Sequence, residues 1–129
     1  MSNLHQSEST SNHDRQTLGR SGEDLAAQWY EASGATIVDR NWRHGRNGEI
    51  DLIVQHGDTV IFCEVKTRRS TRWGIPAEAV GWEKQRRIRS LAAAWLGARQ
   101  ERSGHARFDV ASVVINQSEV TIDVIEAAF

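Results

Sequence analysis

Charged residues interrupt two apolar stretches near the middle of the chain. Their types and spacing are those of a possible catalytic site. The segment from Gly48 to Arg69 reads GEIDLIVQHGDTVIFCEVKTRR. Asp51 lies in the first stretch, and the second ends in an E-x-K triplet formed by Glu64 and Lys66. An unpaired carboxylate is costly to place away from water. Acids at these positions therefore need a partner that neutralises them.

A divalent metal ion is the most economical partner. A hairpin turn at His56–Asp58 would place Asp51 opposite Glu64. Two carboxylates about 4 Å apart repel by roughly 4 kcal/mol at an effective dielectric of 20. Mg²⁺ binds through one or two carboxylates, waters and substrate phosphates, and Lys66 would offset charge on a transferring phosphoryl group. The alternative is a buried ion pair of Lys66 with either acid and no chemistry.

Periodicity predicts the elements that position these residues. Apolar spacing favours helices over residues 18–33 and 76–99. Alternation and turn residues favour strands over residues 35–43, 49–55, 59–68, 106–115 and 119–129. The resulting order is α-β-β-β-α-β-β, which predicts an α/β fold with one mixed sheet flanked by helices. We expect an antiparallel meander first and a parallel pairing after the long crossover helix.

Side-chain spacing also assigns faces. Alternation along a strand puts Glu49 and Asp51 on one face and Ile50 and Leu52 on the other. The apolar stripe of the second helix comprises Val80, Ile88, Leu91, Ala92, Trp95 and Leu96. We assign Trp29, Trp82 and Trp95 to the core, and we interpret Cys63 as a small core residue rather than a nucleophile.

Composition is that of a single soluble domain. The chain has 129 residues, 39% of them hydrophobic and 26% charged. We expect residues 1–16, a polar segment, to be a disordered tail and residues 17–129 to form one domain. The single cysteine excludes an internal disulfide, and no apolar run is long enough to span a bilayer. These features favour a cytoplasmic protein without a membrane partner.

Basic residues are concentrated in one segment. Residues 66–89 contain eight basic and two acidic residues, a net charge of +6. Such a concentration indicates a polyanionic partner, although a solvated helix face would also explain it. Arg40, Arg43 and Arg46 could contact phosphate, but we favour salt bridges to Asp39 or Glu49. Trp73, in the loop after the E-x-K triplet, could stack on a base or cap the core.

The sequence also resembles a known family. The stretch GRSGEDLAAQWYEASGATIVDRNWRHGRNGEIDLIVQHGDTVIFCEVKTRRSTRWGIPAEAV, followed by KQRRI, is similar to the bacterial YraN-like family of predicted endonucleases. More distantly it resembles the PD-(D/E)xK nuclease superfamily, especially archaeal Holliday junction resolvases. The likeness extends from about Leu18 to the C-terminal strands. It implies a restriction endonuclease-like α-β-β-β-α-β core and metal-dependent cleavage of DNA.

Site residues follow from that resemblance. Asp51, Glu64 and Lys66 match the catalytic set of the superfamily, and the helix acid falls on Glu23 rather than on its neighbour Asp24. Ile50 stands where the superfamily name has proline. The resemblance implies that Asp51, Glu64, the carbonyl of Val65 and Glu23 hold Mg²⁺ or Mn²⁺.

The implied partner is DNA, with a preference for branched or junction DNA. The residues expected to bind its phosphates are Arg68, Arg69, Arg72, Lys84, Arg86 and Arg87. Among them, the resemblance implies that Lys84 approaches the active site. A homodimer is a further expectation, because enzymes that cut two strands often act as dimers. Two alternatives stay open. One is a nucleic-acid-binding or interaction module on a nuclease-like fold that no longer cuts, and the other is a structural protein with a buried ion-pair cluster.

Overall fold

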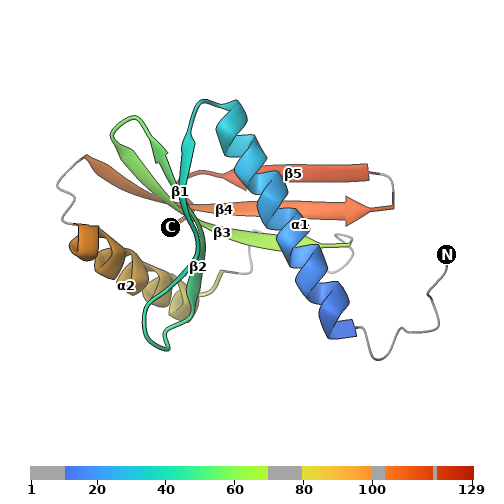
Figure 1. The fold of residues 1–129 in the computed structure, drawn as a ribbon, viewed down its shortest axis with the longest axis horizontal. Helices are drawn as coiled ribbons and strands as arrows, with labels where there is room; N and C mark the ends of the chain where they lie inside the picture. The colour runs from blue at the N-terminus through green and yellow to red at the C-terminus, as the bar shows by residue number, and fades with distance from the viewer. Residues whose placement is uncertain (1–10, 70–79, 100–103, 118) are drawn as a thin grey trace.

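One mixed sheet with a helix on each face makes up the part of the chain that the structure describes (Figure 1). The computed structural model describes residues 11–69, 80–99, 104–117 and 119–129. In chain order its elements are α1 (Ser11–Ala32), β1 (Thr36–Arg43), β2 (Glu49–His56), β3 (Thr59–Arg68), α2 (Trp82–Arg99), β4 (His105–Asn116) and β5 (Glu119–Ile125). The predicted α/β class and element order are confirmed, and the arrangement is compatible with a restriction endonuclease-like fold.

Strand pairing follows the predicted pattern. The strands lie in the order β1-β2-β3-β4-β5. The pair formed by β3 and β4 is parallel, as expected after the crossover helix α2, and the other neighbours are antiparallel. A two-residue turn at Gly57 and Asp58 joins β2 to β3 and fixes their register, with Leu52 opposite Cys63 and His56 opposite Thr59.

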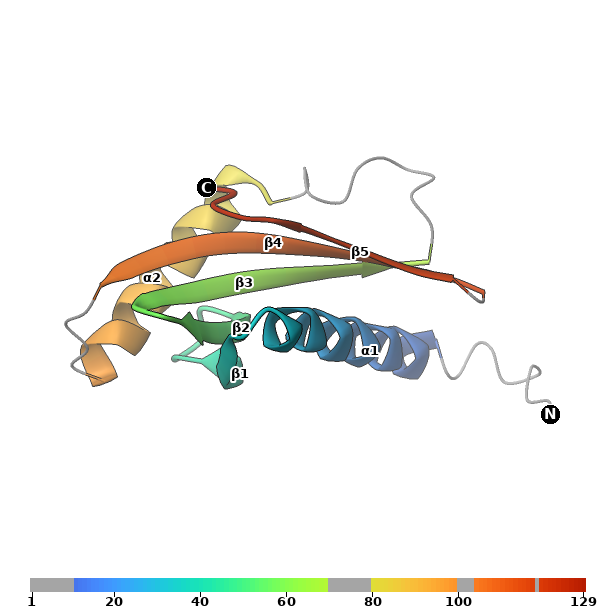
Figure 2. The ribbon, with the colours of Figure 1, turned by 90° about the horizontal axis from the view of Figure 1, so that it is seen from above.

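Helix α1 covers one face of the sheet (Figure 2). Its small residues Ala26 and Ala27 let the helix lie close to the strands, and Tyr30 packs beside them. The strands contribute Leu52, Val54, Ile61, Cys63 and Ala111 to this cluster. Cys63 is fully buried there, which confirms its assignment as a core residue. Burial raises the pKa of its thiol, so the nucleophilic thiolate is disfavoured.

Helix α2 covers the opposite face. Leu91, Ala92 and Trp95 pack against Ile53, Val60 and Phe62 of the sheet. The Trp95 indole also donates a hydrogen bond to Asp39 of β1 at 3.1 Å. Trp95 is therefore a core residue, as predicted. Trp29 is partly buried against the α1 cluster, but the prediction for Trp82 is wrong, because its side chain is 69% exposed.

A buried carboxylate on β4 joins α1 to the segment that follows β5. Asp109 of β4 is fully buried. It accepts hydrogen bonds from the Tyr30 hydroxyl at 2.6 Å, from two guanidinium nitrogens of Arg107 at 2.9 and 3.0 Å, and from the Ala127 amide at 3.1 Å. A buried charge is tolerated only when it is paired and hydrogen-bonded. This set of donors meets that requirement without any added ion.

Helix α1 begins earlier in the chain than expected. Helix α1 begins at Ser11 rather than Leu18, so residues 11–16 of the expected tail are helical. Polar residues such as Arg15 and Gln16 have high helix propensity and extend a helix that is anchored further along the chain. Helix α2 begins at Trp82. The Gln85 amide makes the first helical hydrogen bond, to the carbonyl of Gly81 at 2.9 Å.

Parts of these predictions fall outside the described residues. They are residues 1–10 of the tail, Arg72 and Trp73 of the basic segment, and the expected helix start at Pro76. In the described ranges no helix is long and apolar enough to cross a membrane.

We predict that Gly22 is required for the close contact between α1 and β3. A Cβ atom at Gly22 would overlap the side chain of Thr67, whose own Cβ would lie 2.9 Å away. Gly22→Ala should therefore lower the free energy of unfolding by about 1–3 kcal/mol, the usual effect of overpacking. Urea denaturation measures it. Gly97→Ala is the matched control, because nothing lies within 4 Å of an added Cβ there, and it should stabilise the helix by up to about 1 kcal/mol. Equal effects would contradict the prediction.

Candidate functional site

Three carboxylates from two elements meet at one end of the sheet. Glu23 comes from α1, and Glu49 and Asp51 come from β2. One oxygen from each lies within 4.8 Å of the other two. We call these residues the acid triad. Gly22 immediately precedes Glu23 and lies against Thr67 of β3. This close contact of α1 with the sheet brings the Glu23 carboxylate near Glu49 and Asp51 of β2.

The acid triad forms where β2 separates from β3. The pairing of the two strands ends at Leu52 and Cys63. Beyond it, the Asp51 carboxylate accepts a hydrogen bond from the Val65 amide at 2.8 Å, so a side chain replaces a backbone partner. The expectation that Ile50 and Leu52 share a face is wrong, because Ile50 packs with the α2 cluster and Leu52 with the α1 cluster. Regular alternation ends where the ladder ends.

Asn41 joins two members of the acid triad. Its amide nitrogen lies 3.1 Å from both Glu23 carboxylate oxygens and 2.9 Å from a Glu49 oxygen. Asn41 has a positive φ of 49°, a conformation that asparagine tolerates better than most residues. The backbone thus turns this amide toward the carboxylates, although Asn41 lies within β1.

Neighbouring arginines engage other acids. Arg43 pairs with Glu49 at 3.0 Å, which is one of the salt bridges expected for the arginines of this segment. Arg40 pairs with Asp24 at 2.6 Å. That pair occupies Asp24, and the adjacent Glu23 is the helix acid that joins the acid triad.

The acid triad is electrostatically unfavourable without a cation. Burial, followed by the charge of Glu64, raises the pKa of Asp51 to about 8 against the hydrogen bond from Val65. Burial also raises the pKa of Glu23, and the nearby charge of Glu49 adds to this effect while the Asn41 hydrogen bond opposes it. Bringing acids together with too few donors favours either a bound proton or a bound cation.

The E-x-K residues Glu64 and Lys66 lie beside the acid triad. Glu64 pairs with a lysine of α2 and not with Lys66, the partner that the ion-pair alternative would give it. Glu64 is buried, with 7% of its surface exposed, and it pairs with Lys84 of α2 at 2.5 Å. Burial and the adjacent Lys84 lower the pKa of Lys66. Burial opposes ionisation of Lys84 as well, but the hydrogen bond and charge of Glu64 outweigh it and raise its pKa. Two ammonium groups thus lie next to the acids.

A pocket of about 290 Å³ lies beside three of these acids and Lys84. It is lined by Gly48, Glu49, Asp51, Glu64, Lys84, Arg87, Ile88 and Leu91. Acids from β2 and β3 meet basic side chains from α2 in this space. We call it the acid pocket. A small phosphorylated or phosphodiester group could reach both the carboxylates and the basic side chains here.

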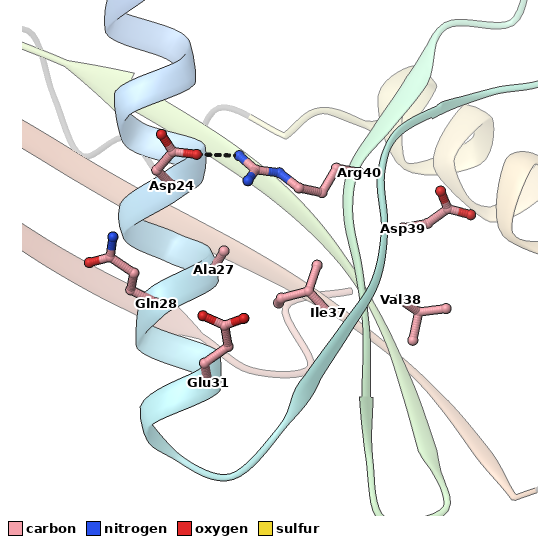
Figure 3. A pocket seen from close by; sticks show the side chains of 8 residues that line it. All are labelled: Asp24, Ala27, Gln28, Glu31, Ile37, Val38, Asp39 and Arg40. Atoms are coloured by element: carbon pink, nitrogen blue, oxygen red, sulfur yellow. Dashed lines mark hydrogen bonds and ion pairs between the residues drawn. The ribbon is translucent and has the colours of Figure 1, made fainter.

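A larger hollow of about 530 Å³ lies elsewhere, between α1 and β1 (Figure 3). Asp24, Glu31, Asp39 and Arg40 contribute its charged lining. The Asp24–Arg40 pair spans its upper part in the view of Figure 3, and Asp39 accepts a hydrogen bond from Trp95. Because Asp24 and Arg40 neutralise each other and Asp39 already has a donor, the acid pocket is the better candidate for chemistry.

The structure brings together most of the residues predicted for the site. Glu23 and Asp51 lie in the acid triad, and Glu64 lines the same pocket as Asp51. Val65 contacts Asp51 through its amide, while its carbonyl stays a predicted ligand. The predicted metal set omits Glu49, although strand alternation already placed it on the face of Asp51. It also omits Asn41, for which the sequence gives no signal.

The predicted phosphate-binding residues are spread around this pocket. Arg86 and Arg87 are exposed on α2, and Arg87 lines the acid pocket. Lys84 reaches inward to Glu64. Arg68 is partly buried at the end of β3 and Arg69, the next residue, is exposed.

We predict opposite pH trends for the stability and for the metal affinity of the protein. Because the folded-state pKa of Asp51 is raised from 3.8 to about 8, the folded chain binds more protons than the unfolded chain between these values. Stability without metal should therefore fall as the pH rises through this window. A cation must displace the bound proton, so Mg²⁺ affinity should rise until about pH 8. Thermal melts and calorimetric titrations at several pH values measure both trends. Asp51→Asn should reduce both trends to the smaller part that the raised pKa of Glu23 contributes, and Asp24→Asn should leave them unchanged. Trends of undiminished size in Asp51→Asn would contradict this prediction.

We predict that the Asn41 amide holds the acid triad in its binding geometry. Asn41→Gly keeps the positive φ accessible but removes the donor, so Glu23 and Glu49 should move apart. Loss of such a supporting hydrogen bond weakens metal binding by about 10–100-fold. Mn²⁺ titration by calorimetry measures the effect. Asn116→Gly, at an exposed position at the end of β4, is the control; equal Mn²⁺ affinity in both variants would rule out this role.

Comparisons with known proteins agree on one family. The sequence model of the family described as "Uncharacterised protein family UPF0102" matches residues 22–113, a range that contains the acid triad, Glu64 and Lys66. A UPF0102 protein of Frankia casuarinae is 55% identical over 96 residues, covering 74% of this chain and 80% of the relative. One of Rhodococcus opacus is 52% identical over 98 residues, covering 76% and 82%. One of Nocardia farcinica is 46% identical over 117 residues, covering 90% and 91%. This chain therefore belongs to the UPF0102 family, the YraN-like family that its sequence resembles.

Proposed function

We propose that the protein is a metal-dependent DNA endonuclease of the PD-(D/E)xK type that hydrolyses phosphodiester bonds. The observation that carries this proposal is the acid triad, whose carboxylate oxygens lie within 4.8 Å of one another. Lys66 and Lys84 are both close enough to interact with the charge of Asp51, and Arg87 lines the adjoining acid pocket. Acids, ammonium groups and an anion-accessible space are what phosphodiester hydrolysis requires.

The donor set fits a hard cation. Glu23, Glu49 and Asp51 offer carboxylate oxygens and neither imidazole nor thiolate, which suits Mg²⁺ or Mn²⁺ better than Zn²⁺. When bound, such an ion neutralises phosphate charge and activates water for attack. The raised pKa of Asp51 would return toward its ordinary range once the cation offsets the surrounding carboxylates.

The chain's own residues would perform the remaining tasks. Lys66, with its lowered pKa, is placed to orient the attacking water and to offset charge on the phosphoryl oxygens. Lys84 holds the buried Glu64 carboxylate in place of an external cation. Direct binding of metal by Glu64, and by the carbonyl of Val65, would require Lys84 to move away and contact the substrate phosphate instead.

DNA binding would depend mainly on the phosphate backbone. Arg86 and Arg87 of α2 and Arg68 and Arg69 near the end of β3 are assigned to it, and Lys84 and Arg72 complete the predicted set. Such contacts make affinity fall as the salt concentration rises and carry little sequence information. A preference for branched DNA and a homodimer stay predictions.

A second candidate function is a binding module that no longer cuts. The Glu64–Lys84 ion pair supports it, since an internal ammonium group already neutralises the acid of the E-x-K triplet. In that case DNA would bind without metal-dependent cleavage.

Cleavage assays separate these functions. We expect nicking or cutting of junction, flap or linear duplex DNA with Mg²⁺ or Mn²⁺, and none with chelator. Asp51→Asn and Lys66→Ala should each reduce the rate by about 100-fold or more, the usual effect of removing one charge-stabilising group. Glu49→Gln tests the triad member that the sequence did not predict and should act similarly. Glu31→Gln, an exposed acid in the hollow of Figure 3, is the control. Cleavage in chelator, or in both Asp51→Asn and Lys66→Ala, would reject the mechanism, whereas binding without cleavage under every metal condition would favour the module.

A further inference from the structure

Trp82, the first residue of α2, is unusually exposed for a large aromatic side chain. Trp82 is 69% exposed, the largest exposed fraction among the exposed large hydrophobic residues that the structure describes. The Arg86 guanidinium carbon lies 5.7 Å from the centre of its ring. One turn of helix therefore presents an aromatic ring and a cation together at the surface.

This pair lies at the end of a basic surface that begins at the acid pocket. Arg87 lines the acid pocket and also a second hollow of about 400 Å³. Arg86 lines that second hollow together with Asn47, Glu83 and Ser90. The hollow thus lies between the N-terminal half of α2 and Asn47, which belongs to the connection between β1 and β2. Arg87 and then Arg86 thus connect the acids to Trp82.

The chemistry of this surface favours a nucleic acid strand over an apolar partner. Two guanidinium groups beside a hollow attract phosphates, and an exposed aromatic ring provides a stacking surface for a base. Bases in an intact duplex are already stacked on their neighbours, so only an unpaired base can use such a ring without the energy needed to flip it out.

We propose that Trp82 and Arg86 form a stacking site for an unpaired base of a DNA strand whose phosphates pass Arg87 on the way to the acid pocket. This inference rests on the proposed nuclease function and names its substrate class as DNA that carries unpaired nucleotides next to the bond to be cut. It also assigns a role to a tryptophan that the sequence placed in the core.

Binding measurements test the site without cleavage. Full-length Asp51→Asn protein in Mg²⁺ is titrated into a blunt duplex and into the same duplex with a single-stranded extension, and fluorescence anisotropy gives each dissociation constant. Adding Trp82→Ala should weaken binding of the extended DNA by about tenfold, as expected for loss of one stacked base, and should change binding of the blunt duplex by less than twofold. Trp82→Phe should retain most of the affinity for the extended DNA.

Two controls make the result specific. Val120→Ala removes another exposed hydrophobic side chain, 51% exposed on β5, and should leave both affinities unchanged. A 2-aminopurine base in the extension should lose fluorescence on binding the Trp82 protein and recover it with Trp82→Ala, because stacking on the ring quenches it.

Each other outcome overturns the inference. Equal losses for both DNAs, or no loss for the extended DNA, would show that Trp82 does not bind an unpaired base, while the cleavage assays could still support the nuclease. A shift from dimer to monomer in Trp82→Ala by light scattering, with DNA affinity unchanged, would assign Trp82 to a contact between two copies of the chain. Failure of the parent protein to bind either DNA would reject this inference and the proposed function together.

Discussion

Repulsion among carboxylates with restricted access to water is the constraint on which the rest of the site depends. Asp51 gains one backbone donor from Val65, and Glu23 and Glu49 share the amide of Asn41. These donors do not compensate for burial, and the pKa of Asp51 is raised to about 8. Asp109 provides the contrast within the same protein, because its buried carboxylate receives an arginine, a tyrosine hydroxyl and an amide. One acid is satisfied by the fold, and the others are left to bind a proton or a cation.

Local departures from regular strand geometry maintain this unfavourable arrangement. Strand β2 leaves β3 after Leu52, so the Asp51 side chain takes a hydrogen bond that a strand backbone would otherwise make. Asn41 adopts a positive φ within β1, and Gly22 lets α1 come close enough to deliver Glu23. Each irregularity is stabilised by the two apolar clusters on either side of the sheet. Local strain at functional sites is sustained in this way by packing elsewhere.

The parts of this arrangement that depend on one local rule, such as the length of a hairpin turn, could be predicted from the sequence. The two-residue turn at Gly57 and Asp58 fixed the register that brings Glu64 near Asp51. The prediction for Trp82 failed because a large aromatic side chain was assumed to be buried, although Trp82 lies outside the apolar stripe of α2 and is exposed at the first residue of that helix. Strand alternation failed at Ile50 because a side-chain hydrogen bond ends the ladder. The resemblance implied that Lys84 approaches the site, but its ion pair with Glu64 was not predicted, because spacing along α2 does not reveal which acid of another strand its side chain reaches.

The parallel pairing of β3 with β4 has a consequence for how the chain is made. Strand β3 lies at the centre of the finished sheet, yet its neighbour β4 follows only after the whole of α2. On the ribosome, the meander of β1, β2 and β3 would emerge first and leave the N–H and C=O groups along one edge of β3 without a partner. Such an edge invites pairing with other nascent chains, and distant pairings also slow folding. Efficient production of this protein would therefore depend on shielding that strand until synthesis has passed residue 116.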